Sequence, residues 1–178
     1  SYQIHLLDDR KLCKYGLSDL PAIMEIINEA RRNLKEQGIN QWQRSYPNAG
    51  VIERDIVAGN CYVAEEEGQV AASFAVSFDG DADYDKIYNG SWRREGRFAV
   101  VHRVAVGAAW RGRGLASAAL RHAEKLSLAR NIDYLKIDTH RDNLPMLRVL
   151  GKNNFAFCGL IDIADGSSRI VFDKICRG

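Results

Sequence analysis

Two arginines and two glycines stand at the start of a predicted helix, directly after a valine-rich strand. The stretch reads Val104-Ala105-Val106-Gly107-Ala108-Ala109-Trp110-Arg111-Gly112-Arg113-Gly114-Leu115-Ala116. The first turn of a helix presents unpaired N–H groups and about half a positive charge, and glycine lets a ligand approach the backbone closely. The guanidinium groups of Arg111 and Arg113 add fork-shaped donors. This spacing predicts a phosphate or pyrophosphate site over residues 111–116.

Two familiar phosphate-binding patterns do not fit this turn. The sequence contains no GxxxxGK[ST] loop, and a dinucleotide fingerprint needs a third glycine where this chain has Ser117. The remaining alternative is an ordinary strand-to-helix turn whose arginines are solvated. The residues alone leave both interpretations open.

The elements that must position this turn alternate between strands and helices. Apolar residues recur at helical spacing up to Gly38, and Asn48 is expected to cap a second helix. The expected strands cover residues 11–15, 61–64, 70–78, 98–106, 134–139, 155–163 and 168–175. Two further helices are expected over residues 114–130 and 144–152. This order predicts an α/β fold, a mixed central sheet of about seven strands flanked by about four helices, in which a crossover implies one parallel strand pair.

Length and composition are typical of one globular domain spanning residues 1–178. The 178 residues are 46% hydrophobic and 27% charged, and 25 basic against 23 acidic residues leave a formal charge of +2. This balance excludes a histone-like polycation, an acidic tail and a disordered chain. No apolar run reaches the roughly 18 residues of a transmembrane helix, and the first residues lack a signal-peptide pattern. We therefore expect a cytoplasmic protein with no membrane partner.

The cysteines and the acidic residues give no pattern typical of a metal site. Cys13, Cys61, Cys158 and Cys176 include no closely spaced pair, so free thiols and no zinc site are expected. Four alternating aspartates from Asp79 to Asp85 do not fit a calcium loop. They could attract a cationic amine, or they could simply be solvated. The surrounding stretch, residues 79–96, is long for a loop and is a candidate lid or acceptor-site wall.

The residues around this turn resemble the GNAT superfamily of N-acetyltransferases. The chain has the apolar-x-Val strand end of that family, Val104-x-Val106, followed by Arg111-Gly112-Arg113-Gly114-Leu115-Ala116 at the usual separation. A second segment runs from Asp138 through Asn143 to Lys152 and Phe155, and it resembles the family's Asn-x-x-Ala segment ending in Lys-x-Gly-Phe. Gln41-Trp42 and Tyr46-Pro47 are similar to pairs in a bacterial branch of the superfamily.

The resemblance implies a GNAT-like acyl-CoA N-acyltransferase fold and transfer of an acetyl group from acetyl-CoA to a primary amine. It implies direct attack in a ternary complex, with no metal. The acceptor would be a small-molecule or peptide amine rather than a nucleic acid, and a homodimer is compatible with the family. The residues that the resemblance assigns to acetyl-CoA are Val104, Ala105, Val106, Arg111, Gly112, Arg113, Gly114, Leu115, Ala116 and Asn143. Most of these roles belong to the backbone, including an N–H at the strand end that faces the thioester oxygen.

His102 is the candidate general base. An alkylammonium has a pKa near 10.4, so its proton must leave before the nitrogen can attack a thioester. Strand alternation puts His102 on the face of Val104 and Val106, and its spacing before Arg111 resembles that of a strand histidine in aralkylamine acetyltransferases of the superfamily. His140 is a second choice. A strand histidine that faces solvent or is satisfied by a neighbour is the alternative.

The sequence departs from the family at the general acid. Many members have a tyrosine where this chain has Leu150, and the usual glycine before Phe155 is Asn154. Leucine cannot protonate the leaving thiolate, so water or another element would have to do so. This departure favours an alternative function, a non-catalytic acyl-CoA-binding or sensing domain.

The acceptor site is the least defined part of the sequence. Gln41, Trp42 and Tyr46 lie in the segment that the superfamily uses for acceptor walls, although Trp42 could equally be a core residue. Six arginines suggest a nucleic-acid binder as a third function, but the charge of +2 and the lack of a nucleic-acid-binding motif disfavour it.

Overall fold

The structure is a computed structural model that describes residues 4–7, 10–14 and 19–176. Its strands are β1 Ile4–Leu7, β2 Arg10–Lys14, β3 Cys61–Glu66, β4 Gln69–Ser77, β5 Ala99–Val106, β6 Tyr134–Thr139, β7 Ala156–Asp162 and β8 Ser168–Ile175. Its α-helices are α1 Leu20–Glu36, α2 Ala49–Val57, α3 Leu115–Ala129 and α4 Leu144–Lys152. The chain forms two compact units, Ser1–Val76 with Arg103–Ala119 and Ser77–His102 with Leu120–Gly178. Strand β5 and helix α3 each contribute residues to both units.

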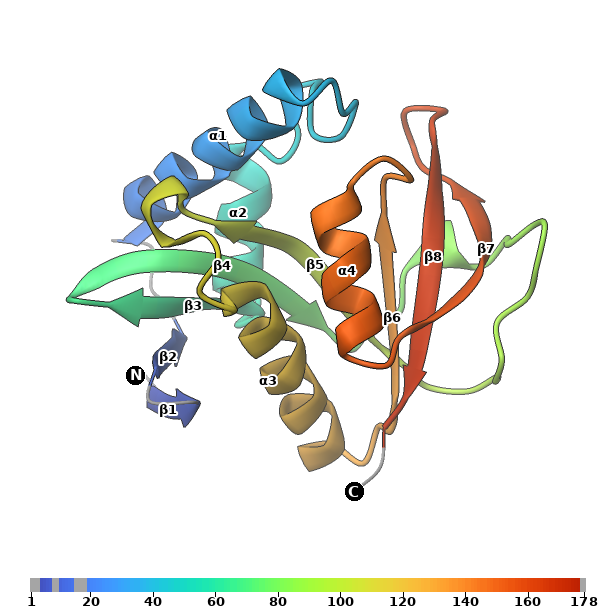
Figure 1. Cartoon of the computed structure of the whole chain (residues 1–178). Helices are drawn as coiled ribbons and strands as arrows, with labels where there is room; N and C mark the ends of the chain where they lie inside the picture. Colours follow the sequence, from blue (N-terminus) through green and yellow to red (C-terminus); the bar gives the residue numbers. More distant parts are fainter. Residues whose placement is uncertain (1–3, 8–9, 15–18, 177–178) are drawn as a thin grey trace. The chain divides into compact units, whose positions relative to one another are not determined.

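The first unit is built on antiparallel strands in the order β1-β2-β3-β4. The β3–β4 hairpin turns at Glu67 and Gly68, both of which have positive φ. Figure 1 shows helices α1 and α2 beside this hairpin. Their apolar faces form a core with β3 and the end of β5, and its buried members are Ile23, Ile26, Ile27, Ile52, Ile56, Cys61, Val63 and Ala105.

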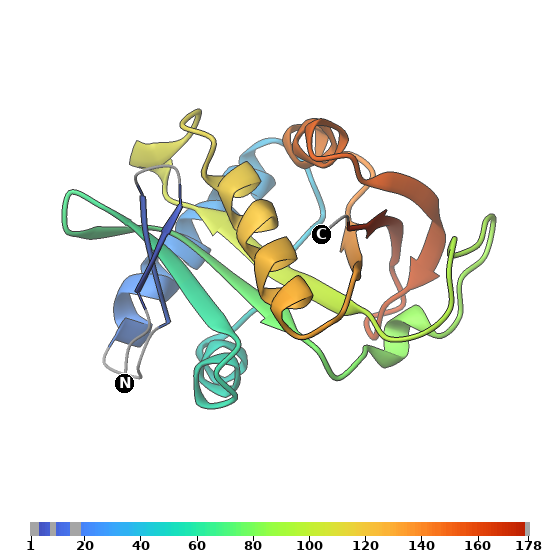
Figure 2. The same ribbon diagram turned by 90° about the horizontal axis from the view of Figure 1, so that it is seen from below.

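The second unit places its strands in the order β5-β6-β8-β7. The first residues of β5 pair with β6 in parallel, Ala99 with Leu135 and Val100 with Lys136. Strand β8 lies antiparallel to both β6 and β7, and the β7–β8 hairpin is drawn in red beside β6 in Figure 2. A buried cluster of Tyr84, Val100, Cys158, Ile161 and Val171 forms a core of this unit.

The sequence-based fold class is confirmed. Eight strands and four α-helices lie within the described residues, against an expectation of about seven and four. The parallel pair across the β5–α3–β6 crossover is present, and β6 and α4 have the predicted bounds. The additional strand is β1, four residues long, which sequence patterning did not predict.

The loop between β4 and β5 is fastened to β6 and β8 of the same unit, and also to itself. The Tyr84 hydroxyl donates to Asp138 at 2.6 Å, and the Trp92 indole donates to the Tyr84 carbonyl at 3.0 Å. Arg93 donates to the buried Asp173 from its backbone N–H at 3.1 Å and from Nε at 2.6 Å. These contacts favour a fixed wall over a lid as the interpretation of residues 79–96.

Glycine permits the closest of these approaches. Tyr88 and Leu160 form a two-way backbone bridge, with N–H to carbonyl distances of 3.0 and 2.9 Å. Two residues further on, a Cβ added to Gly90 would lie 1.9 Å from the Cys158 carbonyl oxygen. Only glycine therefore fits at position 90 while the loop keeps this contact with β7.

Candidate active site

The end of β5 and the turn after it are held firmly within the first unit. Ala105 is 2% exposed and belongs to the core, whereas Val104 and Val106 are partly exposed. The Gly107 N–H donates to the Ala71 carbonyl of β4 at 2.8 Å. The Ala108 N–H donates to Oε2 of Glu29, on α1, at 2.8 Å. The turn that leads into α3 thus has fixed contacts on two elements.

The start of α3 has the properties expected of an anion site. The first helical hydrogen bond joins the Ala118 N–H to the Gly114 carbonyl at 3.0 Å, so the N–H groups of Leu115 and Ala116 precede the intrahelical bonds. Gly112 and Gly114 have φ of 79° and 74°, a region that favours glycine. A Cβ at Gly112 would meet nothing within 4 Å. Residues 111–114 are exposed, so this segment is open to a ligand and fits a phosphate group.

The two arginines of the turn differ in their surroundings. The Arg113 guanidinium lies 4.9 Å from the Trp110 ring centroid and forms an ion pair with Glu66 at 3.3 Å. Arg111 is exposed. Arg113 must leave an existing partner before it can bind a phosphate, whereas Arg111 is available at the surface.

His102 is the last residue of the second unit's share of β5. Its Nε2 lies 3.2 Å from Oγ of Ser77 and 4.0 Å from Oδ2 of Asp81, and its side chain is 15% exposed. The expectation that His102 shares a face with Val104 and Val106 assumed unbroken alternation. That assumption fails, because Arg103 has a φ of 53° and interrupts the extended backbone between them.

Four further residues that the sequence analysis singled out lie in the second unit. Asn143 is the N-cap of α4, and its Oδ1 accepts the Met146 N–H at 3.3 Å. Leu150 is fully buried in the core, and its aliphatic side chain cannot donate a proton. Asn154 has a φ of 64°, the left-handed geometry expected where the family has glycine. Burial and the nearby Arg169 lower the pKa of His140, which weakens that residue as a base.

A comparison with protein families identifies the chain. The model of the acetyltransferase (GNAT) family matches residues 20–155. A crystal structure of a GNAT-family acetyltransferase from Streptococcus agalactiae is 31% identical and has a TM-score of 0.89, covering 99% of this chain and 100% of its own. The chain belongs to the GNAT acetyltransferase family.

Other solved structures share the GNAT fold at lower identity. The PaiA N-acetyltransferase of Thermoplasma acidophilum, in complex with coenzyme A, is 16% identical, with a TM-score of 0.68 over 98% of this chain and 99% of its own. A ribosomal-protein-alanine N-acetyltransferase from Brucella melitensis is 20% identical, with a TM-score of 0.66 over 92% and 98%. No curated protein sequence matches the chain.

The segment between α1 and α2 of this GNAT chain is anchored by Arg31. Its Nε donates to the Trp42 carbonyl at 2.9 Å and its Nη2 to the Pro47 carbonyl at 2.5 Å. Trp42 is partly buried and packs against the core of the first unit, which favours the core interpretation of this residue. The Gln41 carbonyl accepts a hydrogen bond from the Gln43 side chain. Tyr46 is 45% exposed and is the member of the predicted acceptor wall most open to solvent.

The acidic loop and the thiols have structural roles. Oδ1 of Asp81 accepts the Asp83 N–H at 2.9 Å and caps a short 3-10 helix over Ala82–Tyr84. Cys61, Cys158 and Cys176 are buried free thiols, and burial raises the pKa of each to about 12, while Cys13 lies outside the residues with described side chains. Among the described residues, no group of three His, Cys, Asp or Glu side chains could hold a metal ion. In the same residues, no helix is both long and apolar enough to cross a membrane.

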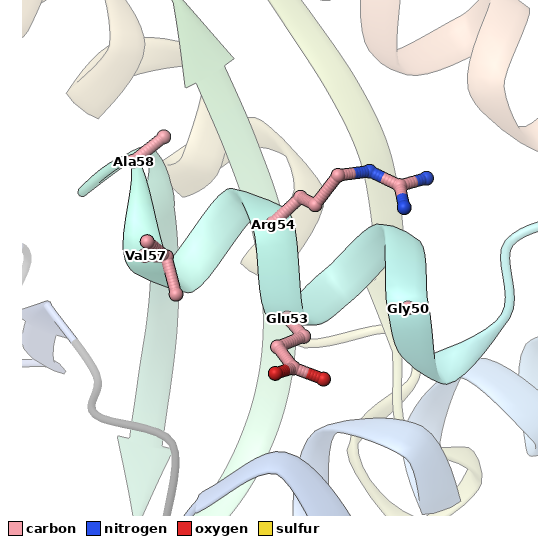
Figure 3. A pocket seen from close by; sticks show the side chains of 5 residues that line it. All are labelled: Gly50, Glu53, Arg54, Val57 and Ala58. Atoms are coloured by element: carbon pink, nitrogen blue, oxygen red, sulfur yellow. The ribbon is translucent and has the colours of Figure 1, made fainter.

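A surface pocket lies on α2, and its lining includes none of the predicted site residues. Gly50, Glu53, Arg54, Val57 and Ala58 line it, and Figure 3 shows their arrangement along the helix. Asp55, the residue after Arg54 of this lining, forms an ion pair with Arg103 of β5. Sequence reasoning missed this pair. The available signal was an arginine inside a mostly apolar strand.

Proposed function

We propose that this GNAT chain transfers an acetyl group from acetyl-CoA to a primary amine of a small molecule or peptide. The observation that carries the proposal is the open helix start at α3, directly after β5. There, four exposed residues, 111–114, and two glycines with positive φ lie at the positions that the family motif assigns to the pyrophosphate.

The donor would bind mainly through the backbone. Arg111, Gly112, Arg113, Gly114, Leu115 and Ala116 would hold the pyrophosphate, and Val104, Ala105 and Val106 would pair with the pantetheine arm. The Asn143 side chain already caps α4 through Oδ1, so any contact with the donor would use its amide NH₂ group. Because these contacts are chiefly N–H donors, side-chain substitutions should weaken binding more than they abolish chemistry.

Transfer requires two deprotonations of the nitrogen and one displacement. The ammonium loses its first proton to a base, and the lone pair attacks the thioester carbonyl carbon to form a tetrahedral intermediate. The nitrogen then loses a second proton to water as the C–S bond breaks and releases the coenzyme A thiolate. We propose His102 as the base, since its side chain is partly open and Ser77 Oγ orients Nε2. Leu150 supplies no acid, so the thiolate leaves as the anion or takes a proton from water.

Ligand-dependent melting tests donor binding. Acetyl-CoA at millimolar concentration should raise the melting temperature by mass action, and coenzyme A should do the same. The absence of any shift would refute both the acetyltransferase and the acyl-CoA-sensing alternative. Thiol release with a panel of primary amines then separates these two functions, because a sensor releases none.

His102→Ala tests the base. We expect turnover at neutral pH to fall by roughly 10²- to 10⁴-fold and to recover partly at alkaline pH, where the free amine is more abundant. Unchanged turnover at neutral pH would eliminate His102. The control is His140→Ala, which should alter turnover much less.

A further inference from the structure

Arg103 has an unusual backbone for a strand residue. Its φ of 53° lies in the left-handed region, which is unfavourable for a residue with a long side chain. It immediately precedes Val104, Ala105 and Val106. A residue in this conformation redirects the peptide groups that follow it, so the torsion at Arg103 determines where the next N–H and C=O groups point.

The Arg103 side chain is held by two partners in the first unit. Nε donates to Oδ2 of Asp55 at 2.7 Å and Nη2 donates to Oδ1 at 2.6 Å, a bidentate fork. Nη1 donates to the Tyr46 hydroxyl at 2.8 Å. The Arg103 and Asp55 side chains are each 13% exposed, so solvent screens this ion pair weakly.

Asp55 is itself fixed by its helix. Asn48 caps α2 by accepting the Val51 N–H at 3.0 Å. Ile52 and Ile56 bury that helix in the core, at 2% and 8% exposure. The Asp55 carbonyl also accepts the Asn60 N–H at 2.8 Å. The fork therefore joins β5 to helix α2, which is held in place by its own cap and by its buried residues.

We propose that Arg103 is a positioning residue and that the Asp55–Arg103 fork sets the β5 backbone at Val104–Val106 for the acyl donor. This inference rests on the proposed function. Strain stored at a single residue persists only where its surroundings over-determine it, and the fork with the Tyr46 contact does so. Lysine cannot replace the fork, because an ammonium group does not bind both carboxylate oxygens in the same plane.

Four substitutions separate positioning from simple stabilisation. Asp55→Asn removes the charge with little change of shape, and Arg103→Lys keeps the charge without the fork. Arg103→Gly accepts the positive φ and lacks the side chain altogether. The matched control is Glu124→Gln, which removes the carboxylate of another ion pair, Lys174–Glu124 at 2.8 Å, whose side chains are 16% and 20% exposed.

Backbone amide resonances test the positioning without reference to activity. In Asp55→Asn and Arg103→Lys we expect the amide signals of Val104, Ala105 and Val106 to shift, and in Glu124→Gln we expect them to stay in place. Unchanged signals in both Asp55 and Arg103 variants would overturn the proposal. This measurement decides the inference even if the wild-type protein fails to bind acetyl-CoA, an outcome that would refute the proposed function alone.

Kinetics then test the consequence for the donor. At a temperature where circular dichroism shows each variant folded, kcat/KM for acetyl-CoA should fall roughly 10- to 100-fold in Asp55→Asn and Arg103→Lys. Glu124→Gln should retain wild-type constants, although its melting temperature falls. A melting-temperature loss in Asp55→Asn with unchanged donor constants would reduce the pair to a stabilising role. Wild-type kinetics in Arg103→Gly would show that positive φ suffices without the fork.

Discussion

At the scale of single residues, the two arginines of the α3 turn differ in the contacts that they already make within the protein. Arg113 already pairs with Glu66 and stacks on Trp110, while Arg111 is exposed. Replacing Arg113 removes contacts within the protein as well as any contact with the ligand. The two arginines of the motif, equivalent in the sequence, should therefore contribute unequally to donor binding.

Arg111→Ala should weaken coenzyme A binding by about fivefold, which is ~1 kcal/mol, as expected for an exposed charge–phosphate contact. Arg113→Ala should weaken it less, since this side chain must first leave Glu66. Isothermal titration calorimetry at low and high salt measures both effects, and the Arg111 effect should shrink with salt. Equal losses in the two variants would contradict this assignment.

A buried carboxylate makes stability depend on acid pH. Burial opposes ionisation of Asp173, but hydrogen bonds from Tyr134 and Arg93 outweigh it and hold the pKa of this carboxyl below its usual 3.8. A lowered folded-state pKa adds stability that is complete above the unfolded value. That stability is lost as the pH falls through the folded-state value.

Asp173→Asn should lower the free energy of unfolding at neutral pH by roughly 1–3 kcal/mol, because it leaves the buried Tyr134 hydroxyl without a charged acceptor. Urea unfolding between neutral pH and about pH 3 gives the comparison, and below the usual pKa range the wild type should lose stability that the variant lacks. If the free energy of unfolding fell equally in the wild type and the variant over that range, Asp173 would be excluded as the source of the pH dependence.

At the scale of elements, the loop between β4 and β5 depends on one glycine for its contact with β7. Gly90→Ala should cost roughly 1–3 kcal/mol more than Gly96→Ala, because the added Cβ meets a carbonyl oxygen. Both glycines have positive φ, 153° and 108°, but a Cβ at Gly96 meets nothing within 4 Å. The pair thus controls for backbone strain, and thermal unfolding measures the difference. Equal destabilisation would mean that the loop moves aside at no cost.

Elements were more predictable from sequence than the contacts among side chains. Helical and alternating patterns predicted β6 and α4 to the residue, since periodicity is a local property of the chain. The glycines of the α3 turn were found in the same way. The Asp55–Arg103 fork was not, because its partners are 48 positions apart and the local signal, an arginine in a mostly apolar strand, does not identify its partner. The alternation argument that put His102 on the face of Val104 and Val106 was also wrong, because the positive φ of Arg103 interrupts the extended backbone.

At the scale of the whole molecule, the family model spans residues 20–155 and so includes parts of both compact units. We propose that residues 1–178 form one cooperative domain. Calorimetry should then show a single unfolding transition whose van't Hoff and calorimetric enthalpies agree. Two resolved transitions would contradict the proposal and assign separate stability to the two units.

The fastened loop between β4 and β5 has a practical consequence for protein engineering. Most of its length is unsuitable for insertion, because Tyr84 and Arg93 fasten it to β6 and β8, and Trp92 forms a hydrogen bond to Tyr84 within the loop. Residues 95–97 differ, since they are exposed and open space surrounds Gly96. A fluorophore or affinity tag inserted at Gly96 should be tolerated where the same insertion at Gly90 would not. This short stretch therefore gives the acetyltransferase a position for surface immobilisation.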